Sequence, residues 1–321
     1  ISKYDLEQYQ SVYREPVIGL FRDIEIISMG PPSSGGLLLI HMLNALENFN
    51  IDTLGWNSTD YVHLLTEIAK RAYADRAQHL GDPDYWDNPR NMFLSKDYAK
   101  KRISNISMDS YTPSKEVYSG IYNDNEGTET THYSVVDKEG NAVAITTTLN
   151  TNFGNKHIVE GAGFLLNNEM DDFSSKPGTA NAWGLIGGKA NAIEPNKRPL
   201  SSMTPTILMY NGQPIMTIGS PGGSKIITTV LQSILNVLVH DMDIKEAVCA
   251  PRFHHQWIPE NTIYIESNGL SRDIITNLES RGHIIKTYGG GYMGVANGII
   301  ISDDGLYGGG DCRNETSAIG Y

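Results

Sequence analysis

Two adjacent threonines, Thr130 and Thr131, stand where a polar stretch of the chain gives way to alternating apolar and polar residues. A threonine hydroxyl inside a chain is a weak nucleophile and needs a base. Cleavage between Glu129 and Thr130 would free the α-amine of Thr130, a group whose usual pKa is about 7.7–8.0. Thr130 would then carry nucleophile and base within one residue. The alternative is that both threonines are ordinary strand residues, since β-branched side chains favour strands.

A glycine-rich run, "GSPGGSK" over residues 219–225, is a second candidate for chemistry. It fails the phosphate-loop template G-x-x-x-x-G-K-[ST], because Ser224 stands at the second glycine. Its backbone N–H groups are unobstructed and precede an apolar helix predicted over 224–240, where partial positive charge collects. Such donors suit an oxyanion hole. A tight turn that simply needs glycine is the alternative.

The acidic run "NNEMDDF" over residues 167–173 holds three carboxylates, which suggests a glycosidase. A strand here would point Asp171 and Asp172 to opposite faces, so the two make a poor acid/base pair. His254 and His255 are adjacent and lack the i, i+4 spacing of a helical metal pair. Packing is therefore the expected role of these histidines, and no metal or cofactor is predicted.

Composition excludes several classes of protein. The net charge of −12 over 321 residues argues against a nucleic-acid partner. The two cysteines, Cys249 and Cys312, exclude a zinc ribbon or a disulfide-dense scaffold, but leave one disulfide or two free thiols open. No run approaches the roughly 18 apolar residues of a membrane span, and the first residues do not resemble a signal peptide. The start without Met suggests a fragment or a processed chain.

The elements that must position these residues follow from hydrophobic periodicity. Threonines 130 and 131 begin a predicted hairpin of strands 130–136 and 142–149, joined by the turn "DKEGN". Apolar residues spaced by three and four predict helices over 37–49, 59–80, 224–240 and 273–282, with Ser58 as the N-cap of the second. Further strands are expected over 18–29, 161–173 and 204–220. This mixture indicates one layered α+β or α/β body.

Several long runs resemble γ-glutamyltranspeptidases in the same order and at similar spacing. They are "TTHYSVVDKEGNAVAITTTLN", "LLNNEMDDFS", "PNKRPLSSMTPT", "GSPGGSKIITTVLQ" and "APRFHHQW", with "PPSSGG" and "YADRAQHLGDPD" upstream. The resemblance covers essentially the whole chain. It implies an α+β fold of the N-terminal nucleophile hydrolase type, a four-layer αββα sandwich. Residues 1–129 would be the C-terminal part of a large subunit and residues 130–321 the whole small subunit, together one structural domain.

The resemblance also implies an activity. The precursor would cut itself between Glu129 and Thr130, and Thr130 would then attack γ-glutamyl amides such as glutathione. Thr148 matches a threonine that hydrogen-bonds the nucleophile, and Thr131 is expected to be structural. Water or an amino-acid or peptide acceptor would resolve the γ-glutamyl-enzyme. No cofactor is implied, and the family's location is periplasmic or extracellular.

Further positions match the family's substrate-binding residues. The oxyanion hole matches Gly222 and Gly223. Glu169 and Asp172 match residues that bind the substrate's α-ammonium, and Asn150 matches a residue that helps there. Ser201 and Ser202 match serines that hold the α-carboxylate. Trp183 matches a gating aromatic residue in a lid loop over 177–188. The family's carboxylate-binding arginine lies upstream of anything that matches here, and no arginine of this chain is assigned to it. An acylase of cephalosporin type, a poly-γ-glutamate transferase and an inactive homologue or fragment remain alternatives.

Overall fold

A six-stranded antiparallel sheet lies at the centre of the structure. The computed structural model describes residues 2–117, 130–174, 176, 178–179, 187–289 and 292–320. In spatial order the strands are β1 (Val17–Phe21), β2 (Ile24–Ser28), β5 (Thr206–Tyr210), β6 (Gln213–Gly219), β10 (Asn297–Ser302) and β11 (Gly305–Gly310). Strand β2 pairs with β5, so segments almost 180 residues apart share one sheet, as Ser28 lies opposite Thr206.

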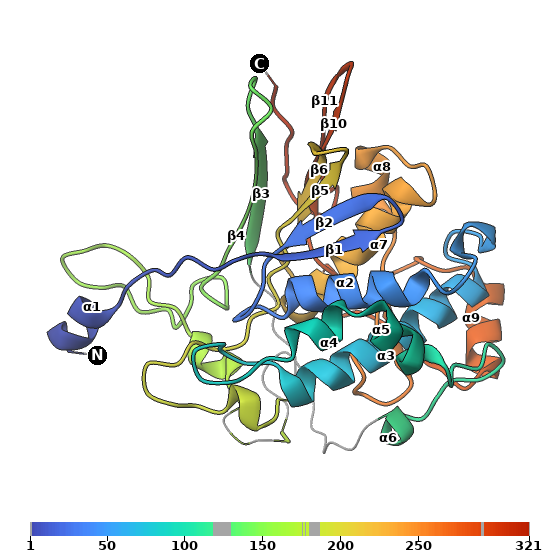
Figure 1. Cartoon of the computed structure of the whole chain (residues 1–321), viewed down its shortest axis with the longest axis horizontal. Helices are drawn as coiled ribbons and strands as arrows, with labels where there is room; N and C mark the ends of the chain where they lie inside the picture. The colour runs from blue at the N-terminus through green and yellow to red at the C-terminus, as the bar shows by residue number, and fades with distance from the viewer. Residues whose placement is uncertain are drawn as a thin grey trace.

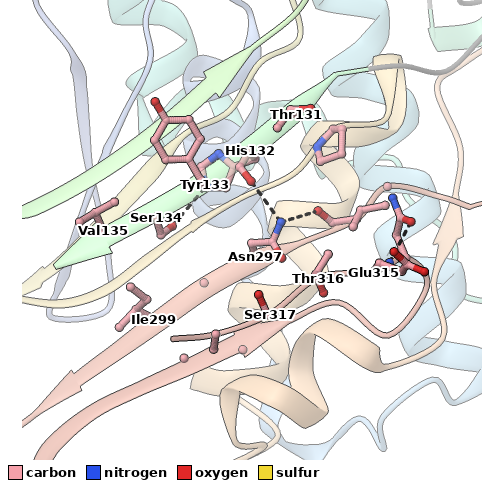
Figure 2. Close-up of a pocket in the computed structure, with 18 of the residues that line it drawn as sticks. Thr131, His132, Tyr133, Ser134, Val135, Asn297, Ile299, Glu315, Thr316 and Ser317 are labelled. Carbon is pink, nitrogen blue, oxygen red and sulfur yellow. Dashed lines mark hydrogen bonds between the residues drawn. The ribbon is translucent and has the colours of Figure 1, made fainter. Parts of the chain in front are cut away.

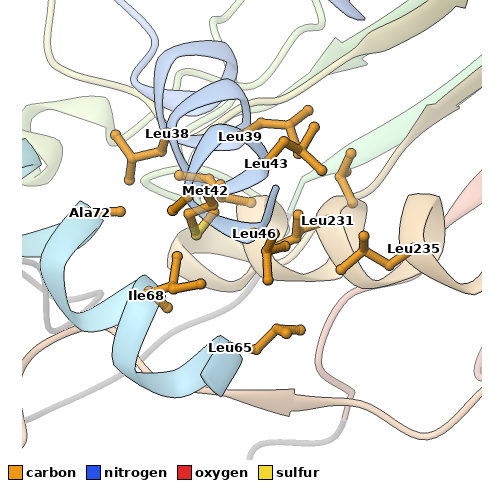
Figure 3. Close-up of a cluster of buried hydrophobic side chains, with 14 of the residues drawn as sticks. Leu38, Leu39, Met42, Leu43, Leu46, Leu65, Ile68, Ala72, Leu231 and Leu235 are labelled. Atoms are coloured by element: carbon orange, nitrogen blue, oxygen red, sulfur yellow. The ribbon is translucent and has the colours of Figure 1, made fainter. Parts of the chain in front are cut away.

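Helices cover one face of this sheet. Helix α2 (Gly35–Leu46) runs directly beneath β1 and β2, and α3 (Thr59–His79), α4 (Arg90–Leu94) and α5 (Lys96–Ile103) lie beyond it (Figure 1). All twelve residues of α2 are buried, as its run of apolar residues around the whole helix requires. Its leucines meet α3 and α7 (Ile226–Leu238) in the main core, where Leu43, Ile68 and Leu231 pack together (Figure 3). Burying each such side chain contributes about 1.5–3 kcal/mol.

Helix α3 confirms the helix predicted over 59–80 and its N-cap. The Ser58 hydroxyl accepts a hydrogen bond from the Tyr61 N–H at 3.2 Å. The polar side of α3 is buried as well, because Glu67 forms ion pairs with both Lys70 and Arg71. Burial raises the pKa of Glu67, but the charges and hydrogen bonds of Lys70 and Arg71 outweigh it and lower the pKa to about 2. Helix α3 is therefore a central helix rather than a surface one.

The predicted hairpin is confirmed as β3 (Thr131–Val136) and β4 (Ala142–Thr147). Its turn is closed by the Asp137 carboxylate, which accepts from the N–H groups of Glu139 and Asn141 at 3.0 and 2.8 Å. The hairpin lies against β6 and β10, where the His132 carbonyl accepts from Asn297 Nδ2 at 3.1 Å. Helices, six-stranded sheet and hairpin thus supply three of the four layers of an αββα sandwich within the described residues, and the α+β class is confirmed.

The remaining described elements are small. A second sheet orders β7 (Phe253–His254), β8 (Thr262–Ile265) and β9 (Ile284–Thr287). The other helices are α1 (Lys3–Gln8), α6 (Ser114–Val117), α8 (Ile244–Cys249), α9 (Arg272–Ser280) and the 3₁₀ turns η1 (Ile51–Thr53), η2 (Glu169–Asp172), η3 (Lys189–Asn191) and η4 (Gly223–Lys225). Cys249 and Cys312 are paired as a disulfide, with Cα atoms 5.4 Å apart. No helix within the described ranges is long and apolar enough to cross a bilayer.

The strand expected over 161–173 is wrong. Gly161 and Gly163 adopt φ angles of +79° and +75°, which break an extended chain, and η2 (Glu169–Asp172) follows them. The argument that placed Asp171 and Asp172 on opposite faces of a strand therefore does not apply. In a 3₁₀ turn the side chains at i and i+3 lie one above the other, which brings Glu169 and Asp172 to the same side.

Candidate active site

The hairpin places the two threonines expected at the centre of the chemistry next to each other. Thr131 pairs with Thr147, so Thr130 lies across from Thr148, one step beyond each strand. The Thr130 hydroxyl donates to Thr148 Oγ1 at 3.3 Å, and the same oxygen accepts from the Asn150 N–H at 2.8 Å. The hydrogen bond from the Asn150 N–H holds the Thr148 hydroxyl in place, and the Thr148 hydroxyl can therefore orient the Thr130 hydroxyl oxygen. Glu129, on the other side of the expected scissile bond, lies outside the described residues.

One small cavity gathers most of the predicted site. Its predicted members come from the hairpin, from η2, from the serine pair and from the glycine-rich turn: Thr130, Thr148, Asn150, Asp172, Ser201, Ser202 and Gly223. The cavity volume is about 20 Å³, room for roughly one water molecule. A bound amino-acid head group would therefore have to widen it. Trp183 lies outside the described residues, so its expected position near this cavity stays a prediction.

Asp172 is the carboxylate that lines the cavity, and Glu169, at the other end of η2, lies beside Asp172 but does not line the cavity. Both side chains are half-buried, and they share a hydrogen bond. Burial raises the pKa of Glu169, against the lowering effect of the bond with Asp172. Two carboxyl groups can share such a bond only while one of them keeps its proton. An ammonium group bound here would supply the positive charge that allows both to ionise.

The serine pair also lines the cavity. The "PPSSGG" loop holds it, because the Ser34 N–H and hydroxyl both donate to the Ser201 carbonyl, at 2.9 and 2.8 Å. The Ser201 N–H in turn donates to the Pro32 carbonyl at 2.8 Å. The backbone that carries Ser201 and Ser202 is thus held by hydrogen bonds to residues about 170 positions earlier in the chain.

Arg76 is a functional candidate that the sequence did not single out. Its side chain is only 3% exposed on α3, and its Nε donates to Ser34 Oγ at 2.8 Å while Nη2 donates to Ser202 Oγ at 3.4 Å. No ion pair joins it to a carboxylate of any described residue. Burial lowers the pKa of Arg76 to about 10, and the negative charge of Asp172 opposes that shift. Arg76 is thus a buried cation just behind the serine pair at neutral pH.

The glycine-rich turn has the backbone that its sequence suggested. Gly222 and Gly223 have φ angles of +135° and +56°, conformations that side chains with a Cβ rarely adopt. The turn leads through η4 into α7, so its N–H groups lie at a helix start, where partial positive charge accumulates. Gly223 lines the small cavity, whereas Gly222 lines a larger groove.

The larger groove has a volume of about 1270 Å³. It lies between β3, β10 and the segment 314–320 near the C-terminus, with Tyr133 and Val135 along one side and Ile299 and Glu315 among the residues across from them (Figure 2). Thr130 lines both the groove and the small cavity. An acyl group bound to Thr130 and held in the small cavity could therefore be transferred to a molecule that arrives through the groove.

The adjacent histidines are held within the protein by hydrogen bonds. His254 bonds through Nδ1 to Thr228 Oγ1 at 2.7 Å and through Nε2 to Gln256 Oε1 at 2.9 Å. His255 Nδ1 bonds to the Thr262 carbonyl at 2.8 Å. Within the part of the chain that the structure describes, no group of three or more His, Cys, Asp or Glu side chains is arranged to hold a metal ion.

Comparisons with known proteins place these features in context. The family model described as Gamma-glutamyltranspeptidase matches residues 1–321. The glutathione hydrolase proenzyme of Escherichia coli (strain K12) is 47% identical over 98% of this chain, which spans 54% of that protein. A solved structure of γ-glutamyltranspeptidase from Pseudomonas nitroreducens, complexed with L-DON, is 44% identical with a TM-score of 0.58; the match covers 60% of this chain and 99% of that one.

A third comparison concerns the fold alone. The crystal structure of cephalosporin acylase from Bacillus halodurans matches 100% of this chain with a TM-score of 0.82 at 24% identity, and the match covers 56% of that chain. The chain thus spans about half the length of the curated relatives and of this acylase.

Proposed function

The chain belongs to the γ-glutamyltranspeptidase family and has the N-terminal nucleophile hydrolase fold, and on that premise we propose that it forms the catalytic part of an enzyme that transfers and hydrolyses γ-glutamyl groups. One observation carries the proposal. A single cavity beside Thr130 has an acidic side at Asp172 and a hydroxyl side at Ser202, backed by the Arg76 cation. A γ-glutamyl donor carries an α-ammonium and an α-carboxylate, which need both of these sides.

Maturation is the first proposed step. The Thr130 hydroxyl attacks the carbonyl carbon of Glu129, and the peptide C–N bond breaks as the acyl group moves from nitrogen to oxygen. Water then hydrolyses the ester, which leaves the Glu129 carboxylate and a free Thr130 α-amine. Residues 130–321 are 192 of 321 residues, 60% of the chain, and the Pseudomonas nitroreducens chain covers the same share of it. That agreement supports a small subunit that begins at Thr130.

Turnover then repeats the same chemistry on a substrate. The Thr130 α-amine takes the hydroxyl proton as the oxygen attacks the γ-carbonyl, and the Thr148 hydroxyl orients that oxygen. The N–H groups of Gly222 and Gly223 stabilise the oxyanion, and each such donor contributes about 2.7–4 kcal/mol in other acyl-transfer enzymes. The leaving amine takes the proton and departs, and water or an acceptor amine resolves the ester.

The decisive experiment replaces each threonine in turn, in the protein expressed from its complete coding sequence. Thr130→Ala should abolish cleavage, seen as one species instead of two by intact mass under denaturing conditions. It should also lower turnover of γ-glutamyl-p-nitroanilide by more than about a thousandfold. Thr131→Ala should keep both the cleavage and the turnover, because Thr131 of β3 pairs with Thr147 of β4 through its backbone and its side chain is exposed. Equal loss in the two variants would show that Thr130 is not the nucleophile.

The choice of donor separates this proposal from an acylase. Glutaryl-p-nitroanilide has the same five-carbon acyl chain and the same terminal carboxylate as the γ-glutamyl compound, but it lacks the α-ammonium. A site in which the Asp172 carboxylate binds the α-ammonium should prefer the γ-glutamyl compound by at least tenfold in kcat/KM. Preference for the glutaryl compound would favour the acylase alternative.

The proposed donor class includes glutathione, as the relatives' names suggest. A periplasmic or extracellular location is part of the same proposal. The paired Cys249 and Cys312 support it, since disulfides persist in oxidising compartments. Recovery of the protein with cytosolic markers after cell fractionation would contradict that location.

A further inference from the structure

Tyr73 connects the central helix to the glycine-rich turn. Its side chain is only 2% exposed, in the middle of α3, and its hydroxyl donates to the Ser224 carbonyl oxygen at 2.5 Å. Ser224 is the middle residue of η4 (Gly223–Lys225), and η4 begins directly after Gly222. Burial raises the pKa of the Tyr73 hydroxyl, so this group remains a neutral donor at physiological pH. The bond therefore links α3 to the backbone of the proposed oxyanion hole at physiological pH.

The turn depends on such links from outside. Two consecutive glycines with positive φ give it little conformational preference of its own, because glycine populates many backbone conformations. On its N-terminal side the turn is fixed by Ser220, whose hydroxyl donates to the Pro221 carbonyl at 2.6 Å and accepts from the Val295 N–H at 3.0 Å. On its C-terminal side the Tyr73 bond to the Ser224 carbonyl links the turn to α3, and the Lys225 ammonium lies 4.6 Å from the centroid of the Tyr288 ring. The contacts of Ser220 and the bond from Tyr73 thus lie on either side of Gly222 and Gly223.

The same face of α3 reaches the other half of the site. Arg76 follows Tyr73 by three residues, a spacing that places both side chains on one face of a helix. Arg76 contacts Ser34 and Ser202, while Tyr73 contacts Ser224. One buried helix thus sets the position of the oxyanion donors relative to the proposed carboxylate site.

We propose that Tyr73 is a positioning residue for acyl transfer, whose hydroxyl holds the Gly222 and Gly223 N–H groups in the orientation that receives the oxyanion. This inference rests on the proposed function. The oxyanion exists only in the tetrahedral state, so loss of the hydroxyl should slow the reaction without weakening binding of the ground state. Deletion of a whole oxyanion donor costs about 10²–10³ in kcat in other enzymes. Misaligned donors should cost less, about 10- to 100-fold.

The test compares two tyrosines of the same helix in the protein expressed from its complete coding sequence. Tyr73→Phe removes the hydroxyl and its bond. Tyr61→Phe is the matched control, because Tyr61 is also buried on α3 and its hydroxyl has no hydrogen-bond partner among the described residues. Thermal unfolding of both variants establishes that each is folded. Neither tyrosine lines the small cavity or the groove.

Four quantities are measured: kcat and KM for γ-glutamyl-p-nitroanilide, inhibition by L-glutamate, and inhibition by the analogue of glutamate that carries a boronic acid at the γ-position. The boronate becomes tetrahedral on the nucleophile and therefore reports the oxyanion hole. We expect Tyr73→Phe to lower kcat and weaken boronate inhibition by about 10- to 100-fold each, with KM and L-glutamate inhibition within about twofold of wild type. Tyr61→Phe should match wild type in all four.

If Tyr73→Phe cleaves itself only slowly, the rate of that cleavage also tests the role of Tyr73. Self-cleavage before Thr130 passes through a tetrahedral state of the same kind, so its rate, followed by intact mass, should fall in Tyr73→Phe and not in Tyr61→Phe. Unchanged kcat, or equal weakening of boronate and L-glutamate inhibition, would overturn the role of Tyr73. If wild type and Tyr61→Phe also fail to turn over γ-glutamyl donors, the proposed function falls, and the inference falls with it.

Discussion

The Ser202 hydroxyl receives a hydrogen bond from a buried guanidinium, and this sets the direction of its own proton. Arginine can only donate, so the Ser202 oxygen accepts from Arg76 and the hydroxyl hydrogen is left for another acceptor. A carboxylate in the small cavity is the natural acceptor. Arg76 would then act on the substrate through Ser202, while Asp172, which lines the same cavity, supplies the negative charge for the α-ammonium.

Arg76→Lys tests this relay. Lysine keeps the charge but loses the planar fork that reaches Ser34 and Ser202 together. We expect KM for γ-glutamyl-p-nitroanilide to rise about tenfold or more, equivalent to about 1.4 kcal/mol of binding, with a smaller change in kcat. For 4-aminobutyryl-p-nitroanilide, which lacks the α-carboxylate, kcat/KM should be the same in variant and wild type. Steady-state kinetics with both donors provides the measurement.

Arg102→Lys is the control for the Arg76 variant. Arg102 forms an ion pair with Asp75 of α3 at 2.9 Å and does not line the small cavity. This substitution should leave the kinetics of both donors unchanged. An equal loss on both donors in Arg76→Lys would mean that Arg76 supports the fold and not the carboxylate site.

The sequence predicted most residue types of the site but not this arginine. Thr130, Ser202 and the glycine-rich turn match positions to which the resemblance gives a role. Arg76 also stands in a matching run, "YADRAQHLGDPD", but the resemblance gives it no role. Arg76 lies within a helix that also carries Glu67, Lys70 and Arg71. Nothing in a helical pattern distinguishes a buried cation from a solvated one, because the partners that hold it come from distant segments of the chain.

At the scale of elements, short-range patterns predicted the structure well and long-range pairing was not predictable. The hairpin that carries Thr130 follows from alternation and from the turn "DKEGN", and the helix over 59–80 from its cap and periodicity. The strand expected over 161–173 is wrong, since positive-φ glycines break it. The clamp between the loop 30–36 and the serine pair joins segments some 170 residues apart, and no local pattern encodes such a contact.

Helix α2 begins in tight contact with the segment that follows the serine pair, and this contact leads to a prediction about Gly35. A Cβ at Gly35 would clash with Thr204 Oγ1 and the Met203 carbonyl, directly after the serine pair. Gly35→Ala should therefore lower the free energy of unfolding by about 1–3 kcal/mol, as overpacking does. It should also raise KM for γ-glutamyl-p-nitroanilide severalfold, because Ser201 and Ser202 are displaced. Urea denaturation and steady-state kinetics measure the two effects.

Gly55→Ala is the matched control for that clash. Gly55 is exposed, and the nearest atom to an added Cβ is Ser58 Cβ at 3.8 Å, ordinary contact distance. This variant should be close to wild type in stability and in KM. A Gly35→Ala variant that behaves in the same way would show that the clamp can shift without moving the serines.

At the scale of the whole molecule, several histidines are buried in a neutral form. Burial lowers the pKa of His41 and His132 to about 4 and that of His255 and His283 to about 3. These side chains come from α2, from β3 and from the small second sheet with its connections, so no single element accounts for them. The unfolded chain binds protons at these positions below its usual histidine pKa of about 6.5, whereas the folded chain does not.

Stability should therefore fall as pH decreases from about 6.5 toward 4, because the unfolded state gains protons that the folded state excludes. Each fully neutral histidine contributes about 1.4 kcal/mol of this loss at pH 5.5. Urea unfolding of Thr130→Ala, expected to remain a single chain, at pH 7.5 and 5.5 measures the total. His132→Gln should reduce the difference between the two pH values by about 1 kcal/mol. His157→Gln, at an exposed position, should leave it unchanged, and an unaltered difference in His132→Gln would contradict the assignment.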